Sequence, residues 1–424
     1  MVGEAYFSDA DHLHFSFTST ITNKTSLSSS ARSSFSSDES PTVTPTLHRN
    51  RWDPRFAAIK AAADGNLQLS HLKLIRHLGT GNHGRVFLCQ LKDHDGAAFA
   101  LKVIDRDLLN GKKLSHVETE GKILSMLNHP FLPTLYARIE ASHYTCFLID
   151  FCPNGDLHSL LRRQPWKRFS LPAVRFFAAE VLVALEYLHA LGIVYRDLKP
   201  ENVLLRDDGH IMLSDFDLSF VADVFPTVNL LRCRTRSRFA GGGCFGFAVG
   251  TDDDEEVVVP EFVAEPVTAF SRSCVGTHEY LAPEVVSGDG HGNSVDWWAF
   301  GVLIHELLYG TTPFKGASND VTLQNIVSSS RQMKSLHVAE AGISEAKDLI
   351  DKLLVKDPNK RLGCTKGAQD IKRHPFFDGV KWPLIRQCKP PAVAGWTVAK
   401  RRPVGQKEAR WPCESTAVVL ERTR

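Results

Sequence analysis

Apolar residues change their spacing along this chain after about residue 105. Short apolar runs typical of strands come first, at residues 72–76, 86–91 and 98–104. Apolar residues then recur every three or four positions, as in helices, at residues 112–127, 170–192, 294–310 and 344–356. This order predicts an α+β fold with a small strand-rich lobe before a larger helical lobe. A hinge between the lobes is expected near 150–155, where proline and glycine interrupt the pattern.

The chain before the first strand has two different compositions. Residues 16–46 contain 18 serines and threonines among 31 positions. The segment therefore has too few apolar side chains for burial to offset the entropy lost on folding. We expect a disordered tail, either a plain solvated one or one regulated by phosphorylation. Residues 52–63 then predict a helix with Asp53 as its cap and Pro54 in its first turn. Trp52, Phe56 and Ile59 share one face and should dock on the folded body.

Residues 218–270 interrupt the helical half with four arginines, three adjacent glycines and an acidic run. A long run without a repeating pattern inside a domain is usually functional or disordered, so we interpret it as a structureless insertion. The expected organisation is a tail at 1–51, a helical lead-in at 52–71, a small lobe at 72–150, a large lobe at 151–376 with the insertion, and an extension at 377–424.

Composition narrows the class of protein. The chain has 424 residues, enough for two or three domains. Its 50 basic and 48 acidic residues nearly cancel, so the net charge gives no strong positive potential that would favour nucleic-acid binding. The nine cysteines are scattered, without a C-x-x-C pair, which argues against disulfide or zinc frameworks and for a reducing compartment. Neither a secretory signal nor an apolar run long enough for a membrane span is visible.

A glycine-rich loop and a lysine form the first chemical pattern. Gly79-Thr-Gly-Asn-His-Gly84 lies between two strand-like runs, and glycines let backbone amides approach phosphate oxygens. Alone, this pattern is more often an ordinary turn. Lys102 lies in an apolar strand, where it needs a partner that Glu120 on the next helix can supply. An edge-strand lysine is the alternative.

The second pattern is more specific. Tyr195-Arg-Asp-Leu-Lys-Pro-Glu-Asn202 follows a predicted buried helix, and Leu213-Ser-Asp-Phe-Asp217 comes soon after. Asp197 can accept a hydroxyl proton, Lys199 can neutralise phosphate charge, and Asn202 and Asp215 can offer oxygen to a hard cation. Together these residues suggest phosphoryl transfer.

The ordered motifs resemble those of eukaryotic protein kinases. Ala282-Pro-Glu284 and Asp296-Trp-Trp298 complete the series, which spans residues 74–376. Tyr195, the Gly276–Glu284 run and Lys360-Arg-Leu-Gly363 resemble AGC kinases. Asp217 in place of glycine and the insertion resemble the plant AGC VIII group, with details closest to the WAG/PINOID kinases.

The resemblance implies a two-lobed serine/threonine kinase using ATP and Mg²⁺. Lys102, paired with Glu120, would hold the α- and β-phosphates, Asp197 would orient the substrate hydroxyl, and Lys199 would touch the transferred group. Asn202 and Asp215 would hold Mg²⁺. The implied ATP-binding residues are Leu78, Gly79, Thr80, Gly81, Asn82, His83, Gly84, Arg85, Val86, Ala100, Lys102, Asp150 and Cys152.

The resemblance also suggests regulation. Ser273 matches an activation-loop phosphosite whose phosphate would pair with His116 and Arg196. A solvated surface residue is the alternative interpretation of His116. Asp217 restricts the backbone where glycine is usual, so a catalytically weak or silent kinase-fold scaffold is the alternative function. The chain printed here has no terminal F-x-x-F motif, which makes activation through docking of such a motif doubtful.

Substrates and partners are implied less directly. Asp156, Glu201 and Thr277 match substrate-binding positions and suggest a preference for basic residues before the acceptor. WAG/PINOID kinases act on PIN auxin-efflux carriers, which suggests a role in auxin signalling. The expected location is the cytoplasm, at the periphery of the plasma membrane, with the nucleus as another location. We expect a monomer. Four arginines suggest peripheral contact with acidic lipid. The alternative is that they form a solvated charge run. They are Arg232, Arg234, Arg236 and Arg238.

Overall fold

The computed structural model describes the chain in six stretches of one unit, Leu47–Arg424. The described residues are 53–63, 67–81, 83–92, 97–235, 255–328 and 342–394. The predictions for the tail at 1–51, Trp52, Asn82, Arg236, Arg238 and the extension beyond residue 394 lie outside these residues. Those for the Arg232 and Arg234 side chains also lie outside, because only the backbone is described there.

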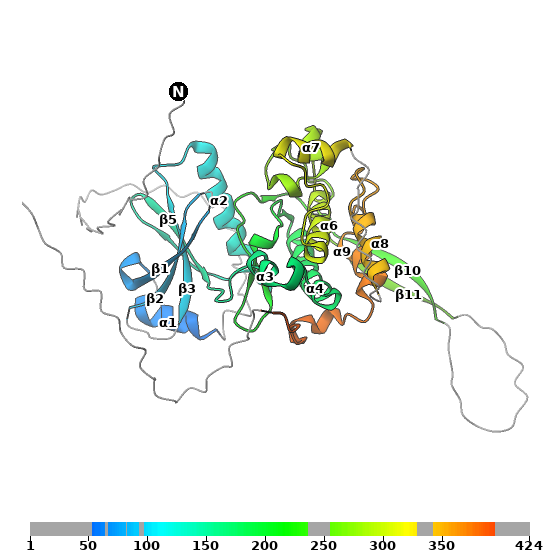
Figure 1. The fold of residues 1–424 in the computed structure, drawn as a ribbon. Coiled ribbons are helices and arrows are strands. Elements are labelled where there is room, and N and C mark those ends of the chain that lie inside the picture. The colour runs from blue at the N-terminus through cyan, green and yellow to red at the C-terminus, as the bar shows by residue number, and fades with distance from the viewer. Residues whose placement is uncertain are drawn as a thin grey trace, which may run out of the picture. The chain divides into compact units, whose positions relative to one another are not determined.

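The small lobe is built on a five-stranded antiparallel sheet in the order β1-β2-β3-β5-β4 (Figure 1). Helix α2, Gly111–Met126, begins at Asn110, whose side chain accepts a hydrogen bond from Lys113 N (3.0 Å). The strands are β1 Leu72–Thr80, β2 Arg85–Leu91, β3 Ala98–Asp105, β4 Leu135–Glu140 and β5 Tyr144–Asp150.

Two helices cover opposite faces of this sheet. Phe147 of β5 is buried in the cluster that includes α2, whereas its neighbours Cys146 and Leu148 are buried in a second cluster. Alternate side chains of a strand point to opposite faces. Helix α1, Pro54–Ala63, packs Phe56 and Ile59 against the second cluster. The expected docking of this helix is therefore observed for these two residues.

The large lobe is mainly helical, and α6, Ser294–Tyr309, is buried along nearly its whole length. Its apolar core surrounds α6 with α4 and α8, as the helical patterns predicted. Among the described residues, no helix is long and apolar enough to cross a bilayer. The other helices are α3 Leu157–Arg163, α4 Leu171–Ala190, α5 Pro283–Ser287, α7 Asn319–Ser328, α8 Ile343–Leu353 and α9 Ala368–Lys372.

The remaining strands form three two-stranded sheets. Two of them are small and follow α4, where they shape the loops described below. The third is a longer hairpin, β10–β11. The strands are β6 Ile193–Val194, β7 Val203–Leu205, β8 Ile211–Leu213, β9 Phe220–Val221, β10 Thr227–Thr235 and β11 Glu255–Val263.

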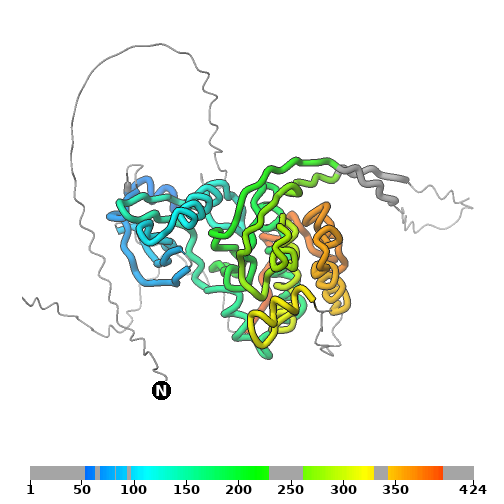
Figure 2. The backbone as a smooth tube through the Cα atoms, turned by 90° about the horizontal axis from the view of Figure 1, so that it is seen from above, coloured from blue at the N-terminus to red at the C-terminus, as the bar shows by residue number. Residues whose placement is uncertain are grey.

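The expectation of a structureless insertion over 218–270 is wrong for three segments, the short strand β9, which pairs with β6, and the strands β10 and β11. Strands β10 and β11 pair in continuous antiparallel register from Thr227–Val263 to Thr235–Glu255, and Figure 2 shows them running side by side away from the helices. The arginine, glycine and acidic runs are typical of a loop, yet residues 227–235 contain two leucines, a valine and two threonines, and residues 255–263 contain four valines, which favour strands.

Candidate active site

A cavity of about 410 Å³ lies between the sheet of the small lobe and the first loops of the large lobe. It is bounded by the turn between β1 and β2, by β3, by the end of β5 and by the loop that contains Asp215. Nine of the residues predicted to bind ATP line it: Leu78, Gly79, Thr80, Gly81, Val86, Ala100, Lys102, Asp150 and Cys152.

Lys102 joins the two lobes across this cavity. Its Nζ lies 2.6 Å from Glu120 Oε1 of α2 and 3.1 Å from Asp215 Oδ1. Lys102 and Glu120 are buried, and burial would disfavour both charges, yet the two carboxylates keep the pKa of Lys102 above its usual value. Burial raises the pKa of Glu120. The predicted lysine–glutamate pair is therefore formed, and it also contacts Asp215.

Asp197 lies at the centre of a second polar cluster, in the loop after β6. Lys199 Nζ donates to Asp197 Oδ2 (2.8 Å) and to Thr277 Oγ1 (3.0 Å). The Thr277 hydroxyl in turn donates to Asp197 Oδ1 (3.1 Å). Burial raises the pKa of Asp197, which its hydrogen bonds from Lys199 oppose. A carboxylate that already accepts an aliphatic hydroxyl is suited to accept one from a substrate.

Asn202 and Asp215 suit a hard cation. The amide nitrogen of Asn202 donates to Asp197 Oδ2 (2.9 Å) and to its carbonyl oxygen (2.8 Å), so its own oxygen is the atom it can offer to a cation. The side chain of Asp215 is 26% exposed, whereas that of Lys102 beside it is 8% exposed. The described residues contain no group of three or more metal-ligating side chains. Two protein oxygens, with phosphate oxygens completing the shell, fit the ordinary coordination of Mg²⁺.

The backbone around these residues is held in unusual conformations. Arg196 and Asp215 have φ of +67° and +59°, in the left-handed region that side chains rarely adopt. Asp296 of α6 accepts from the backbone N–H groups of Tyr195 and Arg196, both at 2.8 Å. Such strain persists where neighbouring contacts over-determine it, typically at functional sites.

His83 has a different position from the one expected. It does not line the cavity, and neither do Gly84 and Arg85. Its Nδ1 lies 2.9 Å from Asp217 Oδ2, and both side chains are almost fully buried. Asp217, the residue in place of the usual glycine, therefore contacts the glycine-rich loop. Gly84 has a packing role, since a Cβ there would lie 2.4 Å from Val103 O.

Comparison with known proteins identifies this arrangement. Residues 72–228 and 245–377 match the protein kinase domain model. The chain belongs to the protein kinase family. The serine/threonine-protein kinase WAG1 of Arabidopsis thaliana is 62% identical over 423 residues, covering 93% of this chain and 88% of the relative. WAG2 of the same plant is 62% identical over 418 residues, covering 93% and 86%.

A more distant relative supports the same group. Protein kinase PINOID 2 of Oryza sativa subsp. japonica is 45% identical over 390 residues, covering 78% of this chain and 79% of the relative. This kinase is therefore a plant AGC-group serine/threonine kinase of the WAG and PINOID type, with the two-lobed fold that its motifs predicted. ATP and Mg²⁺ are the cofactors that membership of the protein kinase family implies.

Ser273, the predicted phosphosite, and Arg196 both donate a hydrogen bond to the hydroxyl of Ser271. Arg196 donates to Ser271 Oγ (3.1 Å), and Ser273 N donates to the same oxygen (3.2 Å). The half-buried His116 is close enough to Arg196 and to His83 for these neighbours to contribute to its lowered pKa, although burial is the first cause. The expected phosphate partners thus lie in one region. A role for Ser273 stays a prediction.

Of the predicted substrate residues, Asp156 lines the cavity, whereas Glu201 and Thr277 do not. Asp156 also caps α3 by accepting from Ser159 N (2.7 Å). Glu201 Oε1 lies 2.7 Å from His158 Nδ1 and is half exposed. Both carboxylates have partners within the chain, so a basic substrate would compete with these contacts.

Sequence reasoning missed most of the apolar lining. These residues carry no chemical motif, but several directly adjoin one, such as Ile149 before the hinge and Phe216 after Asp215. A search of the neighbours of each motif would have found them. The missed residues that line the cavity include Leu124, Pro133, Phe147, Ile149, Phe151, Leu204, Ser214 and Phe216.

Proposed function

We propose that this kinase transfers the γ-phosphate of ATP to serine or threonine through the residues of the two polar clusters. The observation that supports this most directly is Lys102, which contacts Glu120 (2.6 Å) and Asp215 (3.1 Å) at once. This contact places the lysine of the small lobe beside the proposed cation ligand of the large lobe. Little rearrangement is then needed to position the phosphates.

The chain's own residues account for the proton and the charge. Asp197 accepts the hydroxyl proton as the substrate oxygen forms its bond to the γ-phosphorus, and the bond to the β–γ bridging oxygen breaks to release ADP. Lys199, 2.8 Å from Asp197, neutralises charge on the transferred group. Mg²⁺, held by Asn202 and Asp215, would neutralise charge on the ATP phosphates.

The first experiment measures phosphate transfer from labelled ATP with Mg²⁺ by the full chain. Acceptors are a generic basic protein and peptides with arginine before the serine. We expect transfer that Asp215→Ala reduces by at least a hundredfold, while the folded state, checked by circular dichroism, is kept. ATP binding without transfer, even after phosphorylation of Ser273, would instead support the silent-scaffold alternative.

The substrates are proposed on the resemblance to WAG/PINOID kinases. We infer that PIN-type auxin-efflux carriers are phosphorylated on their cytoplasmic loops, at the plasma membrane or from the adjoining cytoplasm. A purified carrier loop should be phosphorylated faster than an unrelated protein with the same basic motifs. Equal rates would argue for other substrates, and recovery of a tagged chain only in nuclei would argue against the membrane location.

A further inference from the structure

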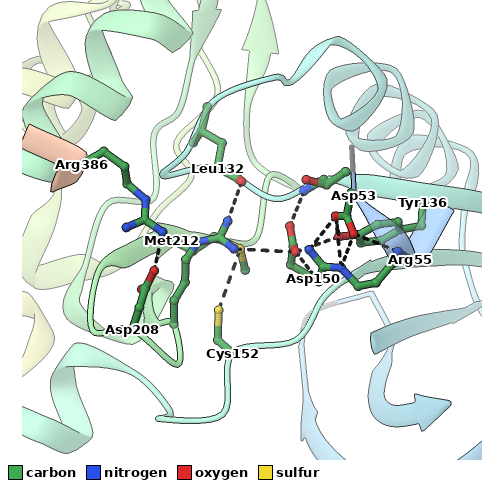
Figure 3. A network of polar contacts seen from close by, with 11 residues as sticks. Asp53, Arg55, Leu132, Tyr136, Asp150, Cys152, Asp208, Met212 and Arg386 are labelled. Atoms are coloured by element: carbon green, nitrogen blue, oxygen red, sulfur yellow. Dashed lines mark hydrogen bonds and ion pairs between the residues drawn. The ribbon is translucent and has the colours of Figure 1, made fainter. Parts of the chain in front are cut away.

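Asp150 lines the nucleotide cavity, and its carboxylate contacts groups of the small lobe and of helix α1. Asp150 is the last residue of β5, and the next residues connect the two lobes. Its carboxylate is 1% exposed. Oδ2 accepts from Thr134 N (2.8 Å), and Tyr136 OH lies 3.0 Å from Oδ1 (Figure 3). A buried charge of this kind requires a nearby cation.

Two arginines supply positive charge, and the nearer one comes from outside the kinase domain. Arg55 of α1 places NH1 2.9 Å from Asp150 Oδ1, whereas Arg206 NH1 of the large lobe lies 3.7 Å away. Coulombic attraction from both arginines opposes the effect of burial and lowers the pKa of Asp150. The family match begins at residue 72, so Arg55 belongs to the preceding segment.

Arg55 is held in place from two further sides. Its Nε and NH2 donate to both oxygens of Asp53, at 2.8–3.1 Å, and its guanidinium lies 4.7 Å from the centre of the Tyr136 ring. The Tyr136 hydroxyl is also 3.0 Å from Asp53 Oδ2 (Figure 3). Phe56 packs against the same ring at 4.9 Å. Helix α1 and the hinge therefore share one network.

We propose that helix α1 positions the adenine side of the ATP pocket, with Arg55 fixing the hinge through Asp150. Without Arg55, the buried carboxylate has to move toward Arg206 or take up a proton. Either change displaces the backbone of 150–152, which lines the cavity. Arg55 and Asp53 are thus positioning residues for nucleotide binding. The inference rests on the proposed use of this cavity for ATP.

The test compares Arg55→Gln with Lys60→Gln in the full chain. Lys60 is an exposed residue in the last turn of the same helix, which makes it a matched control. We expect Arg55→Gln to raise the KM for ATP three- to tenfold, with kcat at saturating ATP and the KM for peptide within twofold of the parent. Arg55→Lys should restore part of the loss, and Lys60→Gln should change nothing.

Two further measurements separate this inference from the proposed function. Calorimetric binding of a non-hydrolysable ATP analogue reports the pocket without transfer. Hydrogen exchange of the hinge amides, residues 150–152, reports the displacement without nucleotide and should be faster in Arg55→Gln than in Lys60→Gln. The proposal would be overturned if Arg55→Gln had the same hinge exchange and the same ATP affinity as Lys60→Gln. A lower melting temperature alone would then mean that α1 only supports the fold.

Discussion

Asp217 connects the glycine-rich loop to the loop that carries Asp215. A glycine at 217 would favour a freely rotating backbone, whereas the aspartate is 2.9 Å from His83 and buried with it. The two residues are 134 positions apart in sequence. The contact holds the β1–β2 turn, which bounds the cavity, against the large lobe.

Asp217→Gly and His83→Ala should each weaken this closure. Each removes one member of a buried hydrogen bond, which costs about 1–3 kcal/mol of unfolding free energy. The double variant should cost less than the sum, because the hydrogen bond between His83 and Asp217 can be lost only once. Urea denaturation of the four proteins measures the coupling. Strictly additive losses would show that the contact contributes nothing.

The catalytic residues could be predicted from sequence because their motifs are local. Asp197, Lys199 and Asn202 lie within six positions, so their proximity follows from chain connectivity. The pairing of Lys102 with Glu120 was predicted from the apolar strand around Lys102 and from the order of the family's motifs. The partners of Asp217 and Asp150 could not be predicted, because a carboxylate's long-range contacts depend on how the lobes and α1 pack.

At the scale of elements, a buried ion pair joins α5 to the segment after α8. Arg361 NH1 and NH2 donate to Glu284 at 2.7 and 2.9 Å, and both residues are buried. Arg361→Ala should lower the unfolding free energy by about 3–5 kcal/mol, because it leaves a buried carboxylate without its cation. Lys360→Ala, at the exposed neighbouring position, should have little effect. Similar melting temperatures for both variants would contradict this.

His189 of α4 connects the base of the hairpin to the catalytic loop. Its ring nitrogens lie 2.7 Å from Glu265 and 2.9 Å from Asp296, the residue that holds the backbone of Tyr195 and Arg196. Burial opposes the charge on His189, but the two carboxylates raise its pKa to about 10 from the ordinary 6.5. The folded state therefore binds this proton more tightly than the unfolded chain.

The stability from His189 should depend on pH in a defined direction. Because its folded pKa is raised, its contribution is full below the unfolded pKa of about 6.5 and is lost as pH rises toward about 10. The change is on the order of a few kcal/mol. Urea denaturation across this range should show a decline in the parent that His189→Gln lacks. Parallel curves for the two proteins would exclude the charged histidine.

The elements themselves were predicted unevenly. Helices α2, α4, α6 and α8 have long repeating apolar faces, and their bounds differ from the expected ones by a few residues. Strands β10 and β11 were missed because their apolar residues adjoin charged and glycine-rich runs. A two-stranded hairpin also lacks the continuous buried face that makes a strand recognisable in sequence.

At the scale of the whole molecule, the insertion is anchored at its base. Glu261 of β11 pairs with Arg373 and Lys366 of the large lobe, and Glu265 accepts from Asn293 (2.7 Å) besides contacting His189. Beyond this base, β10 and β11 stay paired with each other in register as far as Thr235 and Glu255. The kinase fold and the far end of the insertion are therefore expected to be energetically separable.

Replacing residues 236–254 with a short Gly/Ser turn should preserve the fold and the basal activity. Thr235 and Glu255 already face each other across the hairpin, so a short connection can join them, and a shorter loop costs less closure entropy. We expect the melting temperature within a few degrees of the parent and unchanged transfer to a basic peptide. Glu265→Ala, which cuts the anchor instead, should lower both.

The same variant separates catalysis from targeting. If the replaced segment directs the kinase to its substrates, phosphorylation of a carrier loop and sedimentation with acidic vesicles should fall while peptide phosphorylation stays constant. If phosphorylation of the peptide and of the carrier loop fell equally, the replaced segment would be needed for catalysis itself. The connection from Glu265 through His189 to the catalytic loop would then depend on residues far beyond the anchored base of the insertion.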